Sequence, residues 1–390
     1  MEKNKNVPKL RFPEFSGEWE EKKYCEIIIE GKLGGNYENS ESNIGIPVIK
    51  MGNIGRGNIV LGKIQYLPEN ENYNNDDILK EGDLLFNTRN TLELVGKVSI
   101  WRCELPLALY NSNLLRMIFN DQIESSNRFM NYSFNSIKII KQLRAFATGT
   151  TSVAAIYGKD LEHLKISFPS ITEQTKIATF LTAVDEKLTQ LKKKKTLLEQ
   201  YKKGIMQKLF TQELRFKDNN NQDFPDWQEK TLGEVANSIS SGKSKTKDCD
   251  GGYPLYGSTG IIGYSNKYDY SGINILIARV GVNAGSLYVV DGKYSISDNT
   301  LALNLDNNTD VFFIYNLLIK YNLNKMVFGS GQPLVTGGQI KNISIMLPSL
   351  PEQQKIATFL SSIDEKISHS SAQIDKMESW KKGLLQQMFC

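Results

Sequence analysis

The sequence ISFPSITEQTKIATFLTAVDEKL at residues 166–188 returns as IMLPSLPEQQKIATFLSSIDEKI at residues 345–367. The match continues without a gap from 166–210 to 345–389, at a constant offset of 179 residues, and 20 of these 45 positions are identical. Only two copies are present, so the pattern is not that of a solenoid of short repeats. A duplicated unit of this size predicts a pseudo-two-fold protein, which suits a target made of two half-sites.

The duplicated stretch predicts a long helix in each copy. After Pro169 the apolar residues recur at alternating spacings of four and three, and the second copy keeps this rhythm. A 3.5-residue period is typical of a helix that packs along another helix, and each helix is expected to run about 37 residues. Because the chain offers one obvious partner, its own copy, we expect an antiparallel coiled coil; the alternative is a pair of ordinary core helices. The residues expected at the contact are Leu181, Val184, Leu188, Leu360, Ile363 and Ile367.

The two units also begin alike but differ in between. Leu10-Arg11-Phe12 is echoed by Leu214-Arg215-Phe216, and Trp19 is echoed by Trp227. The intervening segments mix short β-branched runs, Gly/Asn turns and helical stretches, which predicts a compact α+β domain in each. The expected organisation is a globular domain at 1–168, a helix at 169–211, a second globular domain at 212–347 and a second helix at 348–390.

Loops of the variable segments carry the residue types that read DNA bases. Arg or Lys reads guanine, Asn or Gln reads adenine, and small hydroxyl or Gly loops let a backbone approach phosphates. The alternative is that these are simply turn residues. For Arg89 and Arg279, which follow matching strand-like runs, the alternative is a salt bridge at the strand end. The candidates for DNA contact are Asn87, Thr88, Arg89, Asn90, Thr150, Lys243, Lys245, Arg279 and Gln332.

Composition narrows the possible functions. The net charge of +4 is compatible with nucleic-acid binding but does not require it. Four scattered cysteines and two histidines argue against a zinc site and for a reducing cytosol. The sequence Ser241-Gly242-Lys243-Ser244 lacks the first glycine of a phosphate-binding loop, because position 237 is Asn. No methyltransferase tetrad or nucleophile elbow is present either, so the pattern favours a reader over a catalyst, with no catalytic residue and no metal site of its own.

No apolar run approaches the roughly 20 residues of a membrane helix, and the first twelve residues contain no signal-peptide core. A cytoplasmic protein with no membrane partner is therefore expected. The run Lys192–Lys195 lies in the middle of the first helix. It is interpreted as a solvated face, with contact to phosphates or an acidic partner as the alternative.

Taken together, the quoted motifs resemble the specificity (S) subunit of Type I restriction-modification systems, over nearly the whole chain. The most specific parts are PSITEQTKIA at 169–178 and PSLPEQQKIA at 348–357, each ahead of a long helix. IPVIKMGNI at 46–54 and PLYGSTGIIGY at 254–264 are also similar to the family.

This resemblance implies two target recognition domains, each binding one half of a split sequence in double-stranded DNA. It also implies conserved helices that set the spacing and dock two methyltransferase subunits, with restriction subunits for cleavage. S-adenosylmethionine, ATP and Mg²⁺ would then belong to those partners, and none to this chain. Two rival classes stay open from the residues alone: a freestanding bipartite DNA-binding regulator, and a structural coiled-coil adaptor.

Overall fold

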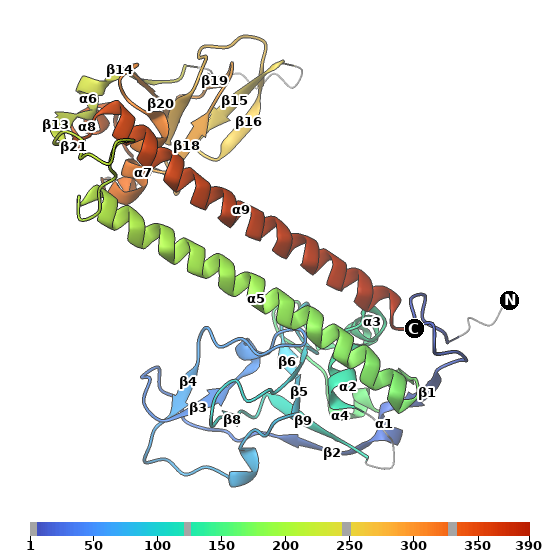
Figure 1. Ribbon diagram of the computed structural model, residues 1–390. Helices are drawn as coiled ribbons and strands as arrows, with labels where there is room; N and C mark the ends of the chain where they lie inside the picture. Colours follow the sequence, from blue (N-terminus) through green and yellow to red (C-terminus); the bar gives the residue numbers. More distant parts are fainter. Residues whose placement is uncertain (1–5, 121–125, 244–250, 327–333) are drawn as a thin grey trace. The chain divides into compact units, whose positions relative to one another are not determined.

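The computed structural model describes residues 6–120, 126–243, 251–326 and 334–390 (Figure 1). The chain divides into two compact units. The first contains residues 1–191 and returns for 373–390, and the second contains residues 192–372. Each unit therefore contains parts of both long helices.

The first unit is built on a four-stranded antiparallel sheet in the order β2-β9-β5-β7. These strands span Ile28–Leu33, Leu114–Phe119, Leu84–Asn87 and Val98–Ile100. A second sheet has the order β4-β3-β8 (Gln65–Leu67, Ile46–Ile49 and Leu109–Tyr110), in which β3 pairs antiparallel with β4 and parallel with β8. Strand β5 is buried at all four residues, so the sheet centre lies inside the unit.

Smaller elements close the first unit. Strand β1 (Glu20–Lys23) pairs with β12 (Lys165–Phe168), and a small sheet has the order β10-β11-β6 (Thr148–Gly149, Ala154–Ala155 and Arg89–Asn90). The helices are α1 (Tyr24–Ile27), α2 (Asn127–Phe134), α3 (Ile137–Phe146) and α4 (Gly158–Leu161), with 3-10 turns η1 (Met51–Asn53) and η2 (Asn75–Asp77). Ser126 and Ser136 are the N-cap residues of α2 and α3, because their side chains accept hydrogen bonds from backbone N–H groups in the first turn of each helix.

The second unit repeats this plan despite its different sequence. Its four-stranded sheet has the order β14-β20-β17-β18 (Ala236–Ser241, Thr300–Leu305, Asn274–Ala278 and Leu287–Val290). The sheet β16-β15-β19 (Gly260–Ser265, Tyr253–Gly257 and Ser295–Ile296) has the same mixture of pairings as β4-β3-β8. The remaining elements are β13 (Gln228–Thr231) paired with β21 (Ser344–Leu347), α6 (Leu232–Val235), α7 (Val311–Tyr321), η3 (Leu323–Met326) and α8 (Gly337–Lys341).

The long helices are α5 (Ile171–Phe210) and α9 (Leu350–Gln387). In the first unit, Leu181 and Val184 of α5 share one buried cluster with Leu384 of α9 and with Met388, the residue that follows α9. A second small cluster there joins Leu188 and Leu191 to Ile374. Residue numbers rise along α5 as they fall along α9, so the two segments run antiparallel.

The second unit contains the other half of each helix. Here Met206 and Leu209 near the end of α5 share the core with Leu360 and Ile363 near the start of α9, and Ile367 packs at its edge. The predicted α+β class with antiparallel packed helices is confirmed. All six predicted contact residues lie in or against these clusters.

We predict that Leu188→Asp lowers the free energy of unfolding by about 3 kcal/mol, because it places an unpaired charge in the helix contact. Leu188 is 7% exposed. Leu197 is 54% exposed on the same helix, so Leu197→Asp is the matched control and should change stability by less than about 0.5 kcal/mol. Urea unfolding followed by circular dichroism measures both. Equal losses in the two variants would show that the contact is placed wrongly.

Candidate nucleic-acid interface and its helical frame

Two ion pairs fix the register of the long helices. In the first unit, Lys381 Nζ of α9 lies 2.6 Å from Asp185 Oδ1 of α5. In the second unit, Lys202 Nζ of α5 lies 2.7 Å from Asp364 Oδ1 of α9. Asp364 and Lys381 stand 179 residues after Asp185 and Lys202, so the two pairs are the same contact formed twice with the helices exchanged. Each unit thus contains the same Asp–Lys contact between the long helices, which explains why the DEK and KKG motifs recur.

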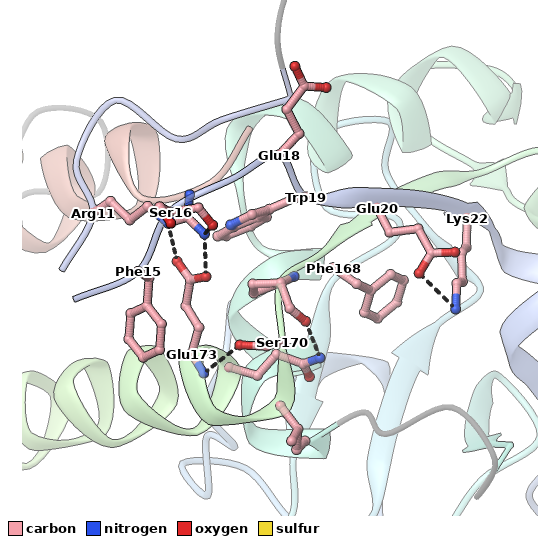
Figure 2. Close-up of a pocket in the computed structure, with 13 residues that line it drawn as sticks. Arg11, Phe15, Ser16, Glu18, Trp19, Glu20, Lys22, Phe168, Ser170 and Glu173 are labelled. Carbon is pink, nitrogen blue, oxygen red and sulfur yellow. Dashed lines mark hydrogen bonds and ion pairs between the residues drawn. The ribbon is translucent and has the colours of Figure 1, made fainter. Parts of the chain in front are cut away.

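A second repeated contact fixes the start of each long helix. Arg11 binds Glu173 through two hydrogen bonds of 2.7 Å, from Nε to Oε1 and from Nη2 to Oε2 (Figure 2). Arg215 binds Glu352 in the same forked geometry, at 3.1 and 2.9 Å. Both carboxylates are almost fully buried. The arginine of each repeated Leu-Arg-Phe segment thus binds the glutamate at the start of a long helix. This role was not predicted from the sequence, although the repeat of the segment indicated that it matters.

The glutamine after each glutamate binds the N-terminal end of a short helix in the same unit. Gln174 Oε1 accepts the backbone N–H of Ser126, the residue that begins α2, at 3.1 Å. Gln353 Oε1 accepts the backbone N–H of Asp310, which begins α7, at 2.8 Å. The Glu-Gln pair therefore joins each long helix both to the segment before its domain and to a helix inside it.

The two clamps differ at one tryptophan. Trp227 Nε1 donates to Glu352 Oε2 at 3.1 Å, so Glu352 has a further side-chain donor besides Arg215. Trp19 Nε1 is buried but has no partner within the described part of the chain. The Trp19 side chain lines a pocket of about 540 Å³ beside the Arg11–Glu173 pair, between the N-terminal segment and the start of α5 (Figure 2). The ion pair occupies one wall of this pocket, which we interpret as part of the structural clamp.

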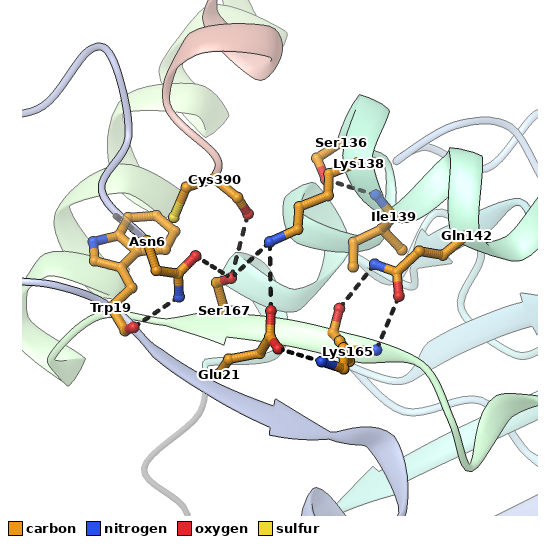
Figure 3. Close-up of polar contacts among 10 residues, drawn as sticks. All are labelled: Asn6, Trp19, Glu21, Ser136, Lys138, Ile139, Gln142, Lys165, Ser167 and Cys390. Atoms are coloured by element: carbon orange, nitrogen blue, oxygen red, sulfur yellow. Dashed lines mark hydrogen bonds and ion pairs between the residues drawn. The ribbon is translucent and has the colours of Figure 1, made fainter. Parts of the chain in front are cut away.

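A polar network also holds the end of α9 within the first unit (Figure 3). Ser167 Oγ on β12 donates to Asn6 Oδ1 at 3.0 Å and reaches the Cys390 carbonyl oxygen at 3.3 Å. Beside it, Lys165 Nζ donates to Glu21 Oε1 at 2.9 Å, and this contact lowers the pKa of the Glu21 carboxyl. The first domain is thus anchored to residues from both ends of the described chain.

The structure brings together two loops that the sequence nominated separately for DNA contact. Arg89 and Asn90 form β6 and pair with β11, whose hairpin partner β10 leads into Thr150. Arg89 and Thr150 are exposed, whereas Thr88 and Asn90 are half-buried. Thr88 Oγ1 donates to the Asn113 carbonyl oxygen at 2.9 Å, and Asn90 Oδ1 accepts from the Thr91 N–H at 2.8 Å.

Asn87 needs a correction. It is fully buried at the end of β5, and its Oδ1 accepts from the Arg89 N–H at 3.3 Å. A side chain closed off from solvent and used in the backbone turn is not presented to a ligand. The sequence Asn-Thr-Arg-Asn at 87–90 therefore contains one buried, structural asparagine and one exposed arginine. For Asn87, the alternative that these are turn residues is the correct one.

A group of cations that the sequence analysis did not single out lies in the first unit. Arg56 Nη2 donates to the Glu93 carbonyl oxygen at 3.1 Å. Burial and then the nearby Arg144 lower the pKa of Arg56, and burial and then Arg56 lower the pKa of Lys97. None of these three cations forms an ion pair with a described carboxylate. Because they come from distant parts of the sequence, only the fold assembles them.

In the second unit the predicted residues are placed differently. Arg279 comes directly after β17 and forms the backbone hydrogen bonds that Thr88 forms after β5, so the predicted equivalence of Arg89 and Arg279 is wrong by one residue. Arg279 Nη1 donates to the Asp298 carbonyl oxygen at 3.3 Å, and its Nε is buried. Lys243 is exposed at the end of β14. Gly242 is needed there for close packing, since an added Cβ would lie 1.9 Å from the Ile296 carbonyl oxygen. Lys245 and Gln332 lie outside the described residues.

The described residues contain no group of three or more His, Cys, Asp and Glu side chains placed to hold a metal ion. Within the same residues, no helix combines the length and apolar character needed to cross a membrane.

The sequence matches the family model described as the Type I restriction modification DNA specificity domain, at residues 16–200 and again at 225–379. The chain belongs to this family. The two matches cover both domains together with most of their long helices, in agreement with the duplicated architecture. The predicted role as a specificity subunit in DNA recognition, and not as a catalyst, is confirmed by this membership, which also implies DNA and further subunits of the system as partners.

Individual relatives agree. The chain is 26% identical to the putative type I restriction enzyme MjaX specificity subunit of Methanocaldococcus jannaschii, over 98% of this chain and 95% of that protein. It is 28% identical to the MjaVIII specificity subunit of the same organism, over 68% and 71% of the two chains. The crystal structure of a type I S subunit from M. genitalium superimposes with a TM-score of 0.66 at 18% identity, covering 98% of this chain and 99% of that one. This last likeness concerns the fold.

We predict that Arg11→Met destabilises the protein more than Arg215→Met. The first substitution leaves the buried Glu173 without its guanidinium partner, which should cost about 3 kcal/mol. The second leaves Glu352 with the Trp227 Nε1 donor, so its cost should be about 1–2 kcal/mol. Urea unfolding gives both values. Adding Trp227→Phe to Arg215→Met should remove the difference, and equal costs in the two single variants would contradict the inferred role of Trp227.

Arg89→Ala and Arg279→Ala should separate DNA contact from structure. Because the Arg89 side chain is exposed, its loss should weaken binding to the target by about 1–3 kcal/mol and leave the melting temperature unchanged. Because Arg279 is hydrogen-bonded and partly buried, its loss should lower the melting temperature by about 2–4 °C. DNA titrations and thermal unfolding measure the two effects. Lost stability with unchanged binding in Arg89→Ala would remove this residue from the interface.

Proposed function

We propose that this chain is the DNA-reading subunit of a type I complex in which each domain reads one half of a bipartite target. The long helices would set the number of base pairs between the halves and dock two methyltransferase subunits. Restriction subunits would join the same assembly for cleavage. S-adenosylmethionine would then be bound by the methyltransferase subunits, ATP and Mg²⁺ also by partner subunits, and the complex would act in the cytoplasm.

One observation carries the division into two readers. The contacts that hold each domain on the helices are repeated: the Arg–Glu clamp, the Gln cap and the Asp–Lys pair all occur once in each unit. The exposed loops are not repeated, as the different surroundings of Arg89 and Arg279 illustrate. Because the contacts with the helices are the same in both units while the exposed loops differ, the structure supports recognition of two different half-sites.

The cations of the first unit support contact with nucleic acid. Arg56 donates to the Glu93 carbonyl oxygen. Besides burial, the charge of Arg144 lowers the pKa of Arg56 and the charge of Arg56 lowers the pKa of Lys97, and none of the three cations has an ion-paired carboxylate within the described chain. Such an arrangement lowers the stability of the free domain and is compensated when a polyanion binds. The exposed Arg89 lies on the neighbouring small sheet and adds a side chain of the type that reads guanine.

Two experiments test this function against its rivals. Binding to DNA containing the target should be selective and should weaken steeply with salt, which a coiled-coil adaptor would not show. Affinity purification from the host should bring down a methyltransferase, which a freestanding regulator would not do. Failure of either result would reject the proposed role.

We predict that inserting one helical turn, four residues, at equivalent mid-helix positions of α5 and α9 changes the spacing of the target and not its half-sites. A turn adds about 5.4 Å to a helix, which is close to the rise of one to two base pairs. Mapping methylated adenines in cells that carry the altered subunit measures the spacing. The same insertion in α5 alone is the control and should impair folding, because it shifts the Asp–Lys register. Altered half-site letters in the double insertion would contradict the assignment of spacing to the helices.

A further inference from the structure

In both domains a turn lies in the loop that leads from the central strand of the sheet to the neighbouring strand, from β5 to β7 and from β17 to β18. In the first, the Leu94 N–H donates to the Thr91 carbonyl oxygen at 3.0 Å, and the Gly96 N–H returns to Asn87 of β5 at 2.9 Å. In the second, the Ala284 N–H donates to the Gly281 carbonyl oxygen at 2.9 Å. There the Gly285 N–H returns to Ala278 of β17 at 2.8 Å. We name these segments, 91–94 and 281–284, the tip turns.

Each tip turn presents an aliphatic residue at its first central position. Leu92 is 38% exposed and Val282 is 100% exposed. The turns read Thr-Leu-Glu-Leu and Gly-Val-Asn-Ala, so both have an apolar residue at the first central and at the last position. At the last position Leu94 is exposed and Ala284 is buried, so the first central position is where both turns expose an aliphatic side chain. A single exposed aliphatic side chain needs no explanation. Its recurrence at the first central position of a turn in both loops does, although the loop from Asn87 to Gly96 is two residues longer than the loop from Ala278 to Gly285.

The surroundings of the first tip turn point to a polyanion. Arg56 Nη2 holds the Glu93 carbonyl oxygen of the turn, and Lys97 and Arg144 lie near Arg56. The Leu92 N–H donates to the Thr151 carbonyl oxygen at 3.2 Å, which places the exposed hairpin 150–153 beside the turn. The Glu93 carboxylate is the one acid of the turn itself, and it forms no ion pair within the described residues.

A protein partner fits this surface poorly. Specific protein interfaces bury about 800 Å² on each side around an apolar centre, whereas each tip offers one or two aliphatic side chains. DNA fits both parts of the surface. The phosphates of DNA would pair with the cations. An aliphatic side chain beside an arginine would contact the edge of a base pair, where the thymine methyl group is the apolar feature of the major groove.

Resting on the proposed function, we infer that the tip turns are base-contacting elements, in which Leu92 and Val282 make apolar contact with base edges, one in each half-site. The contact is of the van der Waals kind and needs no charge. It adds to the discrimination supplied by neighbouring polar side chains, because a wrong base leaves the aliphatic group against a polar edge.

Leu92→Ser and Val282→Ser test this inference in the full chain assembled with its methyltransferase. Each should weaken binding to the complete target by about tenfold, leave binding to unrelated DNA and the salt slope unchanged, and leave the melting temperature unchanged. Mapping of methylated sites should show relaxed selection at a position of one half-site for Leu92→Ser and of the other half-site for Val282→Ser.

The matched controls are Ile29→Ser and Ile319→Ser, which remove aliphatic residues of 60% and 40% exposure elsewhere in the two domains. They should leave binding and selection unchanged. If wild-type protein binds its target selectively and both tip variants bind it equally well, the inference is wrong and the proposed function stands. If wild-type protein shows no selective binding, the proposed function itself fails. Equal weakening on target and unrelated DNA would also overturn base contact, since it would indicate a phosphate contact.

Discussion

The antiparallel packing of α5 against α9 is the constraint on which the rest of the structure depends. A helix that pairs antiparallel with its own duplicate must form every asymmetric contact twice. The Asp185–Lys381 and Lys202–Asp364 pairs meet this condition, one in each unit. The side chains of all four residues are at most about half exposed, and buried aliphatic residues flank them, so a shift of register would separate charges and expose apolar surface together.

This constraint accounts for which residues are repeated and which are not. The repeated residues hold the two long helices and attach the domains to them. They are the aspartate and lysine of the helix contact, the glutamate that binds Arg11 or Arg215, and the glutamine that binds the start of α2 or α7. Each domain forms its own core around a buried central strand, β5 or β17, so its exposed loops are not required for attachment to the helices. Loops beyond that strand are therefore free to differ, as required of surfaces that read different sequences.

Much of this organisation was predictable from the sequence, for physical reasons. The helix pairing followed from a 3.5-residue apolar period seen twice, since such a stripe has to be buried. The matching runs Leu84–Arg89 and Asn274–Arg279 correctly marked the central strand of each sheet. The equivalence of the two arginines was wrong by one residue, because Arg279 takes the place of Thr88 in the backbone hydrogen bonds. It was not predictable that Asn87 would be buried while Arg89, two residues later, is exposed, because polar turn residues look alike in sequence whichever way they face. The proximity of Arg56, Lys97 and Arg144 was not predictable either. It depends on long-range packing between the loop before β4, the residues just before β7 and helix α3.

The measurement that tests the central claim most directly is an exchange of the first domain. Residues 22–165 would be replaced by the corresponding segment of another specificity subunit, with the Arg11–Glu173 clamp and both helices kept, and methylated adenines would be mapped in cells. Two independent readers on one frame predict a motif in which one half-site changes while the other half-site and the spacing stay the same. A motif changed in both halves would contradict the account, because the domains would then not read DNA independently.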